Sequence, residues 1–493
     1  MTTPTRSHRL SKSRFVAGVQ CHKLLWWKVH EPKAEELQPD VVLQDRFDQG
    51  QQVGELAQTH FPGGVLIDFP YREVDAKIAA TSDALKAGAP SIFEASFLAD
   101  DTFVAVDVLE RLDDGFRLIE VKSSSSQKDE HIPDAAVQKH VLSQCGIDVL
   151  AVEIMHLNRE YRHPDQGDLF NRTDVTTPVD EWLGRIPAEL EAQLEMLAGS
   201  CPDVEIGSQC FEPRECPFVG RCWPDSPDHI IKLYNVGSVK AIGYMARGIQ
   251  WISDLPGDEK LPRAAQRQLQ AMQSGELVVE SGLAKDLEAF DVRLGHLDFE
   301  TIQRAIPVWD GLGPWHQAAV QFSYHQEDGS GGFAHAEHLA EGPLDARPAL
   351  ARAMIEATAD AERVVHYSSF EKTRIRSLQK SVPELEPELK ELESKLIDLL
   401  PVIRNNVYHP DFRGSFSLKF VLPALIPELT YDDLVIVDGM VASVTIARLL
   451  FVAVKLSPKQ HEKTRHDLLE YCKRDTWATV KLLERLRELA GQA

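Results

Sequence analysis

Two short acidic motifs at opposite ends of residues 290–493 constrain the fold of this chain most strongly. The first, Asp298-x-Glu300, lies in an apolar-flanked run that predicts a β-strand, where residues i and i+2 share a face. The second, Tyr471-x3-Asp475, precedes apolar residues at helical spacing, and residues i and i+4 of a helix also share a face. The fold is therefore expected to bring one strand and one distant helix together around several carboxylates.

Carboxylates that converge in this way favour a site for two divalent ions. Mg²⁺ or Mn²⁺ ions bound by oxygen ligands can clamp the attacking and leaving oxygens of a phosphodiester. Either motif alone is common by chance, as an ordinary strand or as the polar face of a helix. Their order along the chain and their expected elements favour a hydrolytic site over a structural one.

The two motifs together resemble the DEDD exonucleases of the ribonuclease H-like superfamily, in the variant whose third motif is Tyr-x3-Asp. By that resemblance Asp298, Glu300 and Asp475 hold metal, and Tyr471 orients the attacking water. The resemblance implies an RNase H-like fold and cleavage from 3′ ends.

The middle motif of that family is Asn-x3-Phe/Tyr-Asp, and its nearest match here is His366-x3-Phe370-Glu371. Glutamate stands for aspartate and histidine for asparagine, so the chain departs from the family at both polar positions. Both replacements can serve chemically, and Glu371 is therefore the expected fourth carboxylate of the site.

Two further segments have features of phosphate-binding loops. Residues 406–419 form a polar, glycine-containing loop before a helix, and we expect it to present Arg413, Ser417 and Lys419 to phosphate. Residues 245–256 resemble the glycine-containing turn of a helix–hairpin–helix, whose backbone N–H groups contact phosphate. A plain helical connector is the alternative for the second segment.

The first half of the chain carries a separate arrangement of acids on a predicted β-hairpin. Residues 103–109 form a strand-like run that carries Asp107, and a short turn at residues 113–115 leads into a second strand. Glu120 and Lys122 share one face of that second strand. A partly solvated hairpin with a salt-bridging lysine is the structural alternative.

The pattern Asp-x12-Glu-x-Lys resembles the core of the PD-(D/E)XK nucleases, which have a restriction-endonuclease-like fold. By that resemblance Asp107 and Glu120 bind Mg²⁺ or Mn²⁺, and Lys122 activates water or stabilises the charged transition state. Downstream, Gln138 matches the glutamine of the RecB-type Gln-x3-Tyr motif, although Leu142 takes the place of the tyrosine.

RecB-like enzymes often add an upstream histidine ligand to this core. His60 is one candidate for the upstream ligand, and Glu94, in an otherwise apolar run, is the other. The sequence leaves both open.

The cysteines indicate a metal centre. The chain has seven, an odd number that does not suit a disulfide framework, and Cys210, Cys216 and Cys222 are evenly spaced within 13 residues. Zinc ligands usually lie two to four residues apart, so this spacing suits an iron–sulfur cluster better. Cys21 is the expected fourth ligand, and reduced structural thiols are the alternative.

One cysteine upstream of a nuclease core and three after it resemble the iron staple of RecB-like nucleases. That staple is a 4Fe–4S cluster, which ties the start of the nuclease domain to its end. By that resemblance Cys21, Cys210, Cys216 and Cys222 hold the cluster, although the relatives usually show Cys-x2-Cys-x5-Cys.

Length and composition set the organisation. A chain of 493 residues is too long for one core. We expect an α/β protein with a PD-(D/E)XK domain at residues 1–225, a helical connector at 226–289 and an RNase H-like domain at 290–493. No run approaches the roughly 18–20 apolar residues of a membrane span, and no signal peptide is evident, so a cytoplasmic protein without a membrane partner is expected.

Charge limits how nucleic acid can be bound. The net charge of −23 argues against a wide surface that coats duplex DNA, but it allows a narrow basic groove. Residues 1–30 hold six Lys or Arg and no acid, and this arm could contact a nucleic-acid backbone. An exposed tail joined to an amphipathic helix is the alternative interpretation.

Taken whole, the chain resembles a bacterial family of two-nuclease proteins of unknown function. The resemblance implies a metal-dependent nuclease that acts on DNA ends or single strands in repair or defence. RNA processing, or a nucleic-acid-binding scaffold with one decayed nuclease, are the alternatives. The chain has no phosphate-loop motif of its own, so a separate helicase would have to supply any motor activity.

Overall fold

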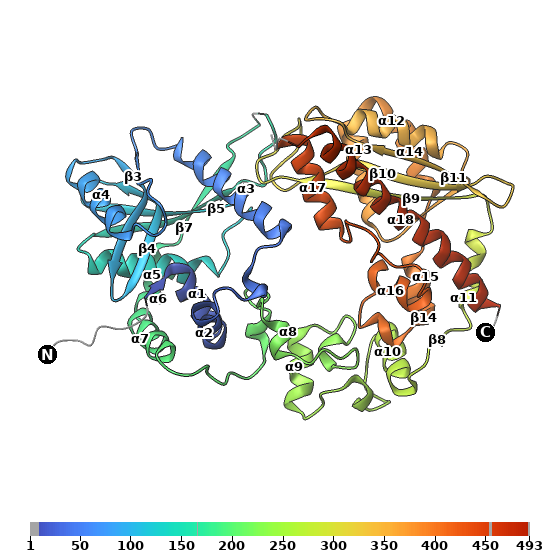
Figure 1. Ribbon diagram of the computed structural model, residues 1–493, viewed down its shortest axis with the longest axis horizontal. Helices are drawn as coiled ribbons and strands as arrows, with labels where there is room; N and C mark the ends of the chain where they lie inside the picture. The colour runs from blue at the N-terminus through green and yellow to red at the C-terminus, as the bar shows by residue number, and fades with distance from the viewer. Residues whose placement is uncertain (1–8, 165, 453–455, 492–493) are drawn as a thin grey trace. The chain divides into compact units, whose positions relative to one another are not determined.

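The chain forms two compact α/β units, which confirms the expected fold class (Figure 1). The first unit comprises residues 1–223 together with 304–315, and the second comprises the remainder. The computed structural model describes residues 9–164, 166–452 and 456–491. Among these residues, no helix combines the length and the apolar character that crossing a membrane requires.

The first unit is built on a mixed sheet of seven strands. Their order is β2-β3-β4-β5-β6-β7, and β1 pairs with β4. The strands are β1 (Leu10–Ser11), β2 (Val65–Leu66), β3 (Ser91–Ala99), β4 (Thr102–Arg111), β5 (Phe116–Lys122), β6 (Val149–Leu157) and β7 (Phe170–Asp174). The predicted hairpin is the antiparallel pair β4–β5 at the centre of this sheet.

Helices cover the sheet of the first unit. They are α1 (Lys12–Gln20), α2 (His22–His30), α3 (Val41–Gln58), α4 (Val74–Lys86), α5 (His131–Gln144), α6 (Thr176–Leu183), α7 (Ile186–Leu197) and α8 (Val219–Cys222). Helix α5 packs across β3 to β6, so Val137 and Leu142 lie in the core beside Val106 and Leu118. Because almost all of α5 is buried, its polar residues must find partners inside the protein.

The second unit is built on a five-stranded sheet of order β11-β10-β9-β12-β13. Its strands are β9 (Leu294–Gln303), β10 (Gln317–Glu327), β11 (Phe333–Leu339), β12 (Arg363–His366) and β13 (Leu396–Asp398); β8 (Val278–Val279) and β14 (Val407–Tyr408) form a separate pair. β9 is antiparallel to β10 and parallel to β12. The first acidic motif thus lies on a strand, as predicted, and that strand is the central one of the sheet.

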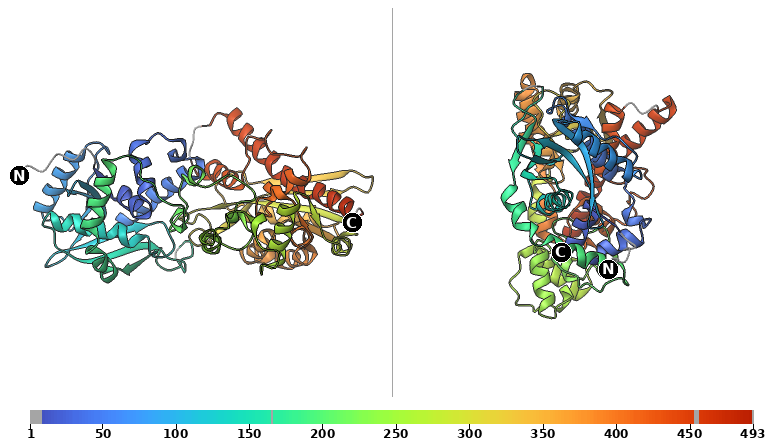
Figure 2. Two further views of the ribbon diagram at one scale, coloured as in Figure 1. Left: turned by 90° about the horizontal axis from the view of Figure 1, so that it is seen from below. Right: turned by 90° about the vertical axis from the view of Figure 1, so that its left-hand side faces the viewer.

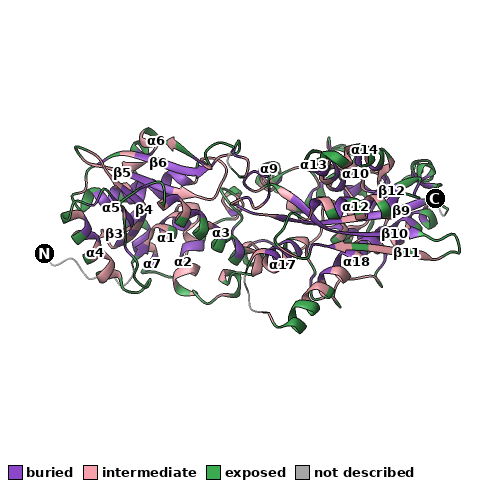
Figure 3. Cartoon of the chain, turned by 90° about the horizontal axis from the view of Figure 1, so that it is seen from above, coloured by how far each residue is buried: buried purple, intermediate pink, exposed green. Residues whose placement is uncertain are grey.

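Helices flank both faces of this second sheet, as the left view of Figure 2 shows with α17 and α18 in red and α12 to α14 in orange. Leu297 and Phe299 of β9 pack with the core of α12 to α14, whereas His296 hydrogen-bonds Thr479 of α18. The helices that contact the sheet are α12 (Arg347–Thr358), α13 (Phe370–Ser381), α14 (Glu386–Lys395), α17 (Gly439–Phe451) and α18 (Pro458–Ala490), and α16 (Leu418–Leu425) packs on α18. Figure 3 shows that the strands are mostly buried while the helices keep exposed faces.

Local signals fix where α18 begins. The side chain of Ser457 accepts a hydrogen bond from the backbone of Gln460, whose side chain accepts one from the Ser457 backbone, and Pro458 occupies the first turn. This capping box satisfies N–H groups that a helix start leaves unpaired. Helix α18 then continues without a break past both residues of the second acidic motif.

Residues 226–289 belong to the second unit and contain short helices: α9 (Ser238–Ala246), α10 (Arg263–Ser274) and α11 (Leu283–Leu287). Helix α9 ends before Gly248, whose φ of 81° is in the left-handed region that glycine adopts most readily. The turn continues into a short 3-10 helix at Ile252–Asp254, and α10 begins only at Arg263.

Candidate functional site

The two acidic motifs of the second unit meet. Asp298 and Glu300 project from β9 and Asp475 projects from α18, and one ligand atom from each lies within 4.8 Å of the other two. Over the described parts of the chain, this is the one group of at least three Asp, Glu, His or Cys side chains that meets this limit. Three carboxylates at this separation can share a divalent cation.

Glu371 of α13 joins this group from a third element. It is hydrogen-bonded to Asp298, and its Oε2 lies 3.4 Å from Nδ1 of His366. On the other side of Asp298, the buried thiol of Cys472 lies 3.7 Å from Oδ2. Glu371 of the middle motif thus lies beside Asp298 of the first motif.

Burial makes this site electrostatically strained in the absence of a cation. It raises the pKa values of Asp298, Glu300 and Asp475 well above their usual range, and repulsion between neighbouring carboxylates raises them further. Burial also raises the pKa of Glu371 to about 8. A cation between these groups would stabilise their ionised forms.

Tyr471 and a second tyrosine border the acids. The hydroxyl of Tyr431 donates a hydrogen bond to Asp475, and hydrogen bonding from Tyr471 also reaches that carboxylate. Both tyrosines line a cavity of about 300 Å³ together with Asp298, Ser417 and Lys419.

Of the three residues predicted to meet phosphate, two lie at this cavity. Ser417 and Lys419 line it, and Lys419 Nζ lies 3.5 Å from Asp438 Oδ2. Arg413 instead pairs with Asp225.

Sequence reasoning did not identify Tyr431 or Asp438. Asp438 lines the cavity and caps α17 by accepting hydrogen bonds from the backbone of Met440 and Val441. An aspartate before Gly439 and a long apolar run is a helix-start signal, and that signal could have placed it at a helix terminus. Nothing local to Tyr431 indicates its contact with Asp475.

In the first unit, the predicted hairpin residues also converge. Lys122 Nζ donates to Glu120 Oε1 and to Asp134 Oδ2, each at 2.7 Å. Gln138 Nε2 donates to Glu120 Oε2 at 2.8 Å, and the backbone N–H of Val121 donates to Asp107 Oδ2 at 2.7 Å. The four residues predicted from the sequence therefore occupy one site.

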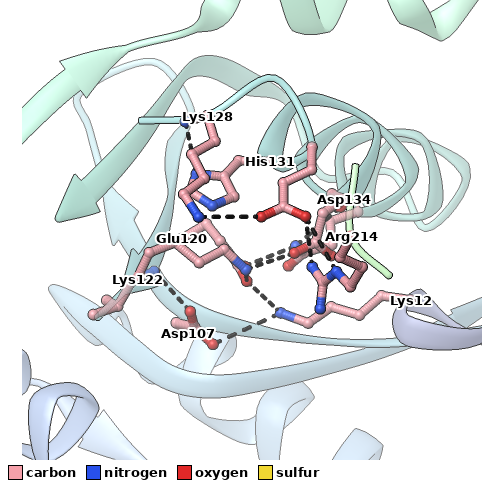
Figure 4. Close-up of polar contacts among 11 residues, drawn as sticks. Lys12, Asp107, Glu120, Lys122, Lys128, His131, Asp134 and Arg214 are labelled. Carbon is pink, nitrogen blue, oxygen red and sulfur yellow. Dashed lines mark hydrogen bonds and ion pairs between the residues drawn. The ribbon is translucent and has the colours of Figure 1, made fainter. Parts of the chain in front are cut away.

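Lys12, at the start of α1, is an unpredicted member of this site. Its Nζ donates to Glu120 Oε1 at 2.7 Å and lies 3.8 Å from Asp107 Oδ1, as Figure 4 shows. Lys12 and Glu120 are 108 residues apart, so no local sequence pattern predicts this contact.

The two carboxylates of this site differ in their protonation. Burial, and then Glu120, raise the pKa of Asp107 to about 7. Burial alone would raise the pKa of Glu120 as well, but Lys12 and Lys122 lower it below its usual value.

The two upstream candidates have different positions. Glu94 lies opposite Asp107 in the β3–β4 register, where its φ of 56° interrupts the regular strand. Glu94 and Asp107 line a cavity of about 500 Å³ whose other acids are Glu55 and Asp68. His60 is exposed at the end of α3 and packs edge-on against Phe170.

The four predicted cysteines line one small cavity. Cys21 lies between α1 and α2, while Cys210, Cys216 and Cys222 lie on the segment that closes the first unit. Gln20 Nε2 donates to the backbone oxygens of Gln209 and Arg214, which ties the two segments together.

The pKa values of Cys216 and Cys222 are raised above their usual range. Burial raises the pKa of Cys216 to about 11, and Cys21, Cys210 and Cys222 add to the rise. Four thiols that would destabilise each other as thiolates are a donor set that suits a cationic metal centre.

Residues 295–417 match the family described as "Domain of unknown function (DUF2779)". The match begins on β9, includes Asp298, Glu300 and Glu371, and ends before Tyr471 and Asp475. It covers less than half of the chain.

Among proteins, the chain is similar to "Uncharacterized protein UU173" of Ureaplasma parvum serovar 3 (strain ATCC 700970), with 24% identity over 220 residues. The similar region covers 40% of this chain and 32% of that protein, so the chain spans about a third of the length of this relative. Among solved structures, "Crystal structure of SSO0001" aligns with 45% of this chain and 89% of its own, at 14% identity and a TM-score of 0.22. At this score the likeness carries no conclusion about the fold.

Proposed function

We propose that the protein is a metal-dependent nuclease with two sites, which hydrolyses phosphodiester bonds of DNA at ends or in single strands. The second unit would be an RNase H-like exonuclease of the DEDD type, and the first a RecB-like PD-(D/E)XK nuclease. The observation that carries the proposal is the convergence of Asp298, Glu300 and Asp475 beside Tyr471. DNA repair or defence against foreign DNA is the proposed setting.

In the second unit, Asp298, Glu300, Glu371 and Asp475 would hold two divalent ions. Bound Mg²⁺ or Mn²⁺ would activate water and neutralise charge on the phosphate. The raised pKa values of Asp298 and Glu300 support this role, because burial and mutual repulsion disfavour ionised forms that a bound cation would stabilise.

The neighbouring side chains would position the substrate. Burial and the nearby carboxylates raise the pKa of Tyr471 above its usual value, so its hydroxyl keeps its proton near neutral pH. Tyr471 can therefore orient a water molecule or a phosphate oxygen, but it does not act as a base. Lys419 and Ser417 border the same cavity and offer donors to phosphate.

In the first unit, Asp107 and Glu120 would hold the divalent ion that hydrolysis requires. Gln138 fixes one oxygen of Glu120, and Lys122 is held by Glu120 and Asp134 on one face of the hairpin. Lys122 can then stabilise negative charge on a phosphate that lies beside these carboxylates. Glu94, opposite Asp107, is better placed than His60 to complete the ligand set.

We further propose that Cys21, Cys210, Cys216 and Cys222 hold a 4Fe–4S cluster. Five residues separate each of Cys210, Cys216 and Cys222 from the next, whereas zinc ligands usually lie two to four residues apart, and this supports a cluster over a single zinc ion. The cluster would link α1 and α2 to the segment that ends the first unit.

End-labelled single-stranded DNA and RNA, digested side by side with Mn²⁺, test the function. We expect shortening of DNA from free 3′ ends, with loss of this activity in the Asp298→Ala variant. Faster digestion of RNA would favour an RNA-processing role. Failure of both polymers to react in every assay would favour a nucleic-acid-binding scaffold.

A further inference from the structure

A cavity of about 330 Å³ adjoins the carboxylates of the first unit. Its walls are formed by α1, α2, the end of β5, the start of α5 and the loop at residues 208–222 that carries three of the cysteines, hereafter the cysteine loop. Its volume is within the range of cavities that hold small ligands. The cations that line it are Lys12, Lys28, Lys122 and Arg214.

Most charges around this cavity are paired. Lys12 and Lys122 both donate to Glu120, and Arg214 donates to Glu130 at 2.8 Å. Of the other two acids in the lining, Asp134 pairs with Lys122 and Glu215 is exposed.

Lys28 is the exception among the lining cations. It forms no ion pair with any residue in the described ranges, although it is half-buried and its neighbours Arg14 and Arg214 are cationic. Burial, then Arg214 and Arg14, lower the pKa of Lys28 below its usual value. Removing a cation from water beside two like charges is unfavourable, and an anion in the cavity would offset that cost.

The uncharged residues of the lining indicate which kind of molecule would carry the anionic group. Val16, Ala17, Leu24 and Pro217 form an apolar part of the wall, which suits a sugar or base rather than a free inorganic ion. Lys122 belongs both to this cavity and to the hairpin site, so a ligand here lies directly beside Glu120.

We propose that this cavity binds a nucleotide of the substrate strand, with the phosphate at Lys28 and Arg214. The proposal rests on the nuclease function proposed above for the first unit. It assigns Lys28 and Arg214 as the residues that bind a phosphate of the substrate strand. Ser13 and Gln20 of α1 add polar groups to the same lining. The four cations of the lining outnumber its three acids, Glu130, Asp134 and Glu215, so the cavity carries a small positive charge in a protein whose net charge is −23.

The cysteine loop would keep this cavity in shape. Arg214 lies between the first and second cysteines of the loop and Pro217 follows the second, and Gln20 ties the loop to α1 by donating to two of its backbone oxygens. A metal centre at the cysteines would therefore hold one wall of the nucleotide site.

Strand binding by the Lys28→Ala variant tests the proposal. Binding of a fluorescent single-stranded oligonucleotide is measured by anisotropy in Ca²⁺ without cleavage, at several salt concentrations. Loss of one phosphate contact should lower the slope of log K against log salt by about 0.7 for a single strand. The affinity at low salt should fall severalfold. Lys33→Ala, which removes an exposed lysine outside the cavity lining, should leave both quantities unchanged.

The outcomes separate this proposal from the nuclease function. Unchanged slope and affinity in Lys28→Ala, in protein that still cuts DNA, would overturn the nucleotide site and leave the nuclease. A Lys28-dependent slope in protein that binds but cuts no strand would support the site and overturn the nuclease. Absence of any strand binding by the parent would overturn the site. Equal melting temperatures of the parent and of Lys28→Ala exclude a folding defect as the cause.

Discussion

Replacing Glu371 with glutamine should stabilise the metal-free protein in a way that depends on pH. Burial raises the pKa of Glu371 from 4.5 to about 8. Between these values the folded state keeps a proton that the unfolded chain has released. Stability therefore falls as pH rises through this window, and the ionised form is the disfavoured one.

The magnitude follows from the width of that window. Each pH unit within it corresponds to about 1.4 kcal/mol, and about two and a half units separate pH 4.5 from pH 7. The free energy of unfolding of the parent is thus lower by about 3 kcal/mol at pH 7, and by about 1 kcal/mol at pH 5, than it would be with a neutral side chain. Glutamine resembles the protonated acid and carries no such loss, so the Glu371→Gln variant should exceed the parent in stability by these amounts.

Thermal unfolding in a chelating buffer measures the effect. At pH 7 the transition of the second unit should rise by about 6–12 °C in the variant, and the gain should shrink towards pH 5. Added Mn²⁺ should stabilise the parent more than the variant, because the variant lacks one anionic ligand. Glu388→Gln makes the same change at an exposed position of α14 and should have no effect.

A difference between Glu371→Gln and the parent that stays constant from pH 5 to pH 7 would refute this reasoning. It would mean that the two side chains differ in packing alone, and that Glu371 does not hold a proton in the folded state.

Three further predictions concern the proposed sites. Asp298→Ala should lose exonuclease activity and Mn²⁺ binding by the second unit while remaining folded, whereas Tyr471→Phe should keep Mn²⁺ binding and retain partial activity; end-labelled DNA and calorimetry distinguish them. Lys122→Ala should abolish one nuclease activity and leave the other, since the two sites lie in separate units; equal rates on every substrate would argue against the first site. Protein purified without oxygen should contain about four iron and four sulfide per chain, as measured by elemental and sulfide assay, and Cys216→Ser should lose them; stoichiometric zinc without iron would contradict the cluster.

Periodicity made the central parts of both sites predictable. Residues Asp298 and Glu300 share a strand face, and Tyr471 and Asp475 share a helix face, so each pair could be placed before the fold was known. The β4–β5 hairpin was predictable for the same reason, because its turn and its alternation are local signals.

Contacts that depend on tertiary packing were not predictable. Lys12 reaches Glu120 only because α1 packs on α5, and Tyr431 reaches Asp475 from a loop without regular periodicity. Glu94 illustrates an intermediate case. An acid in an apolar strand marked it as unusual, but its left-handed φ opposite Asp107 comes from an interrupted strand that no sequence pattern indicated.

The twelve residues 304–315 decide how this protein can be divided in the laboratory. They follow β9, yet they belong to the first unit, where Arg304 forms a buried ion pair with Asp45 at 2.9 Å and Trp315 Nε1 donates to the backbone oxygen of Ser123. A gene truncated after residue 223 would leave Asp45 buried without its counter-ion, a change that costs about 3–5 kcal/mol in comparable cases. Catalytic comparisons between the two sites therefore call for point variants in the full-length chain rather than for separately expressed halves.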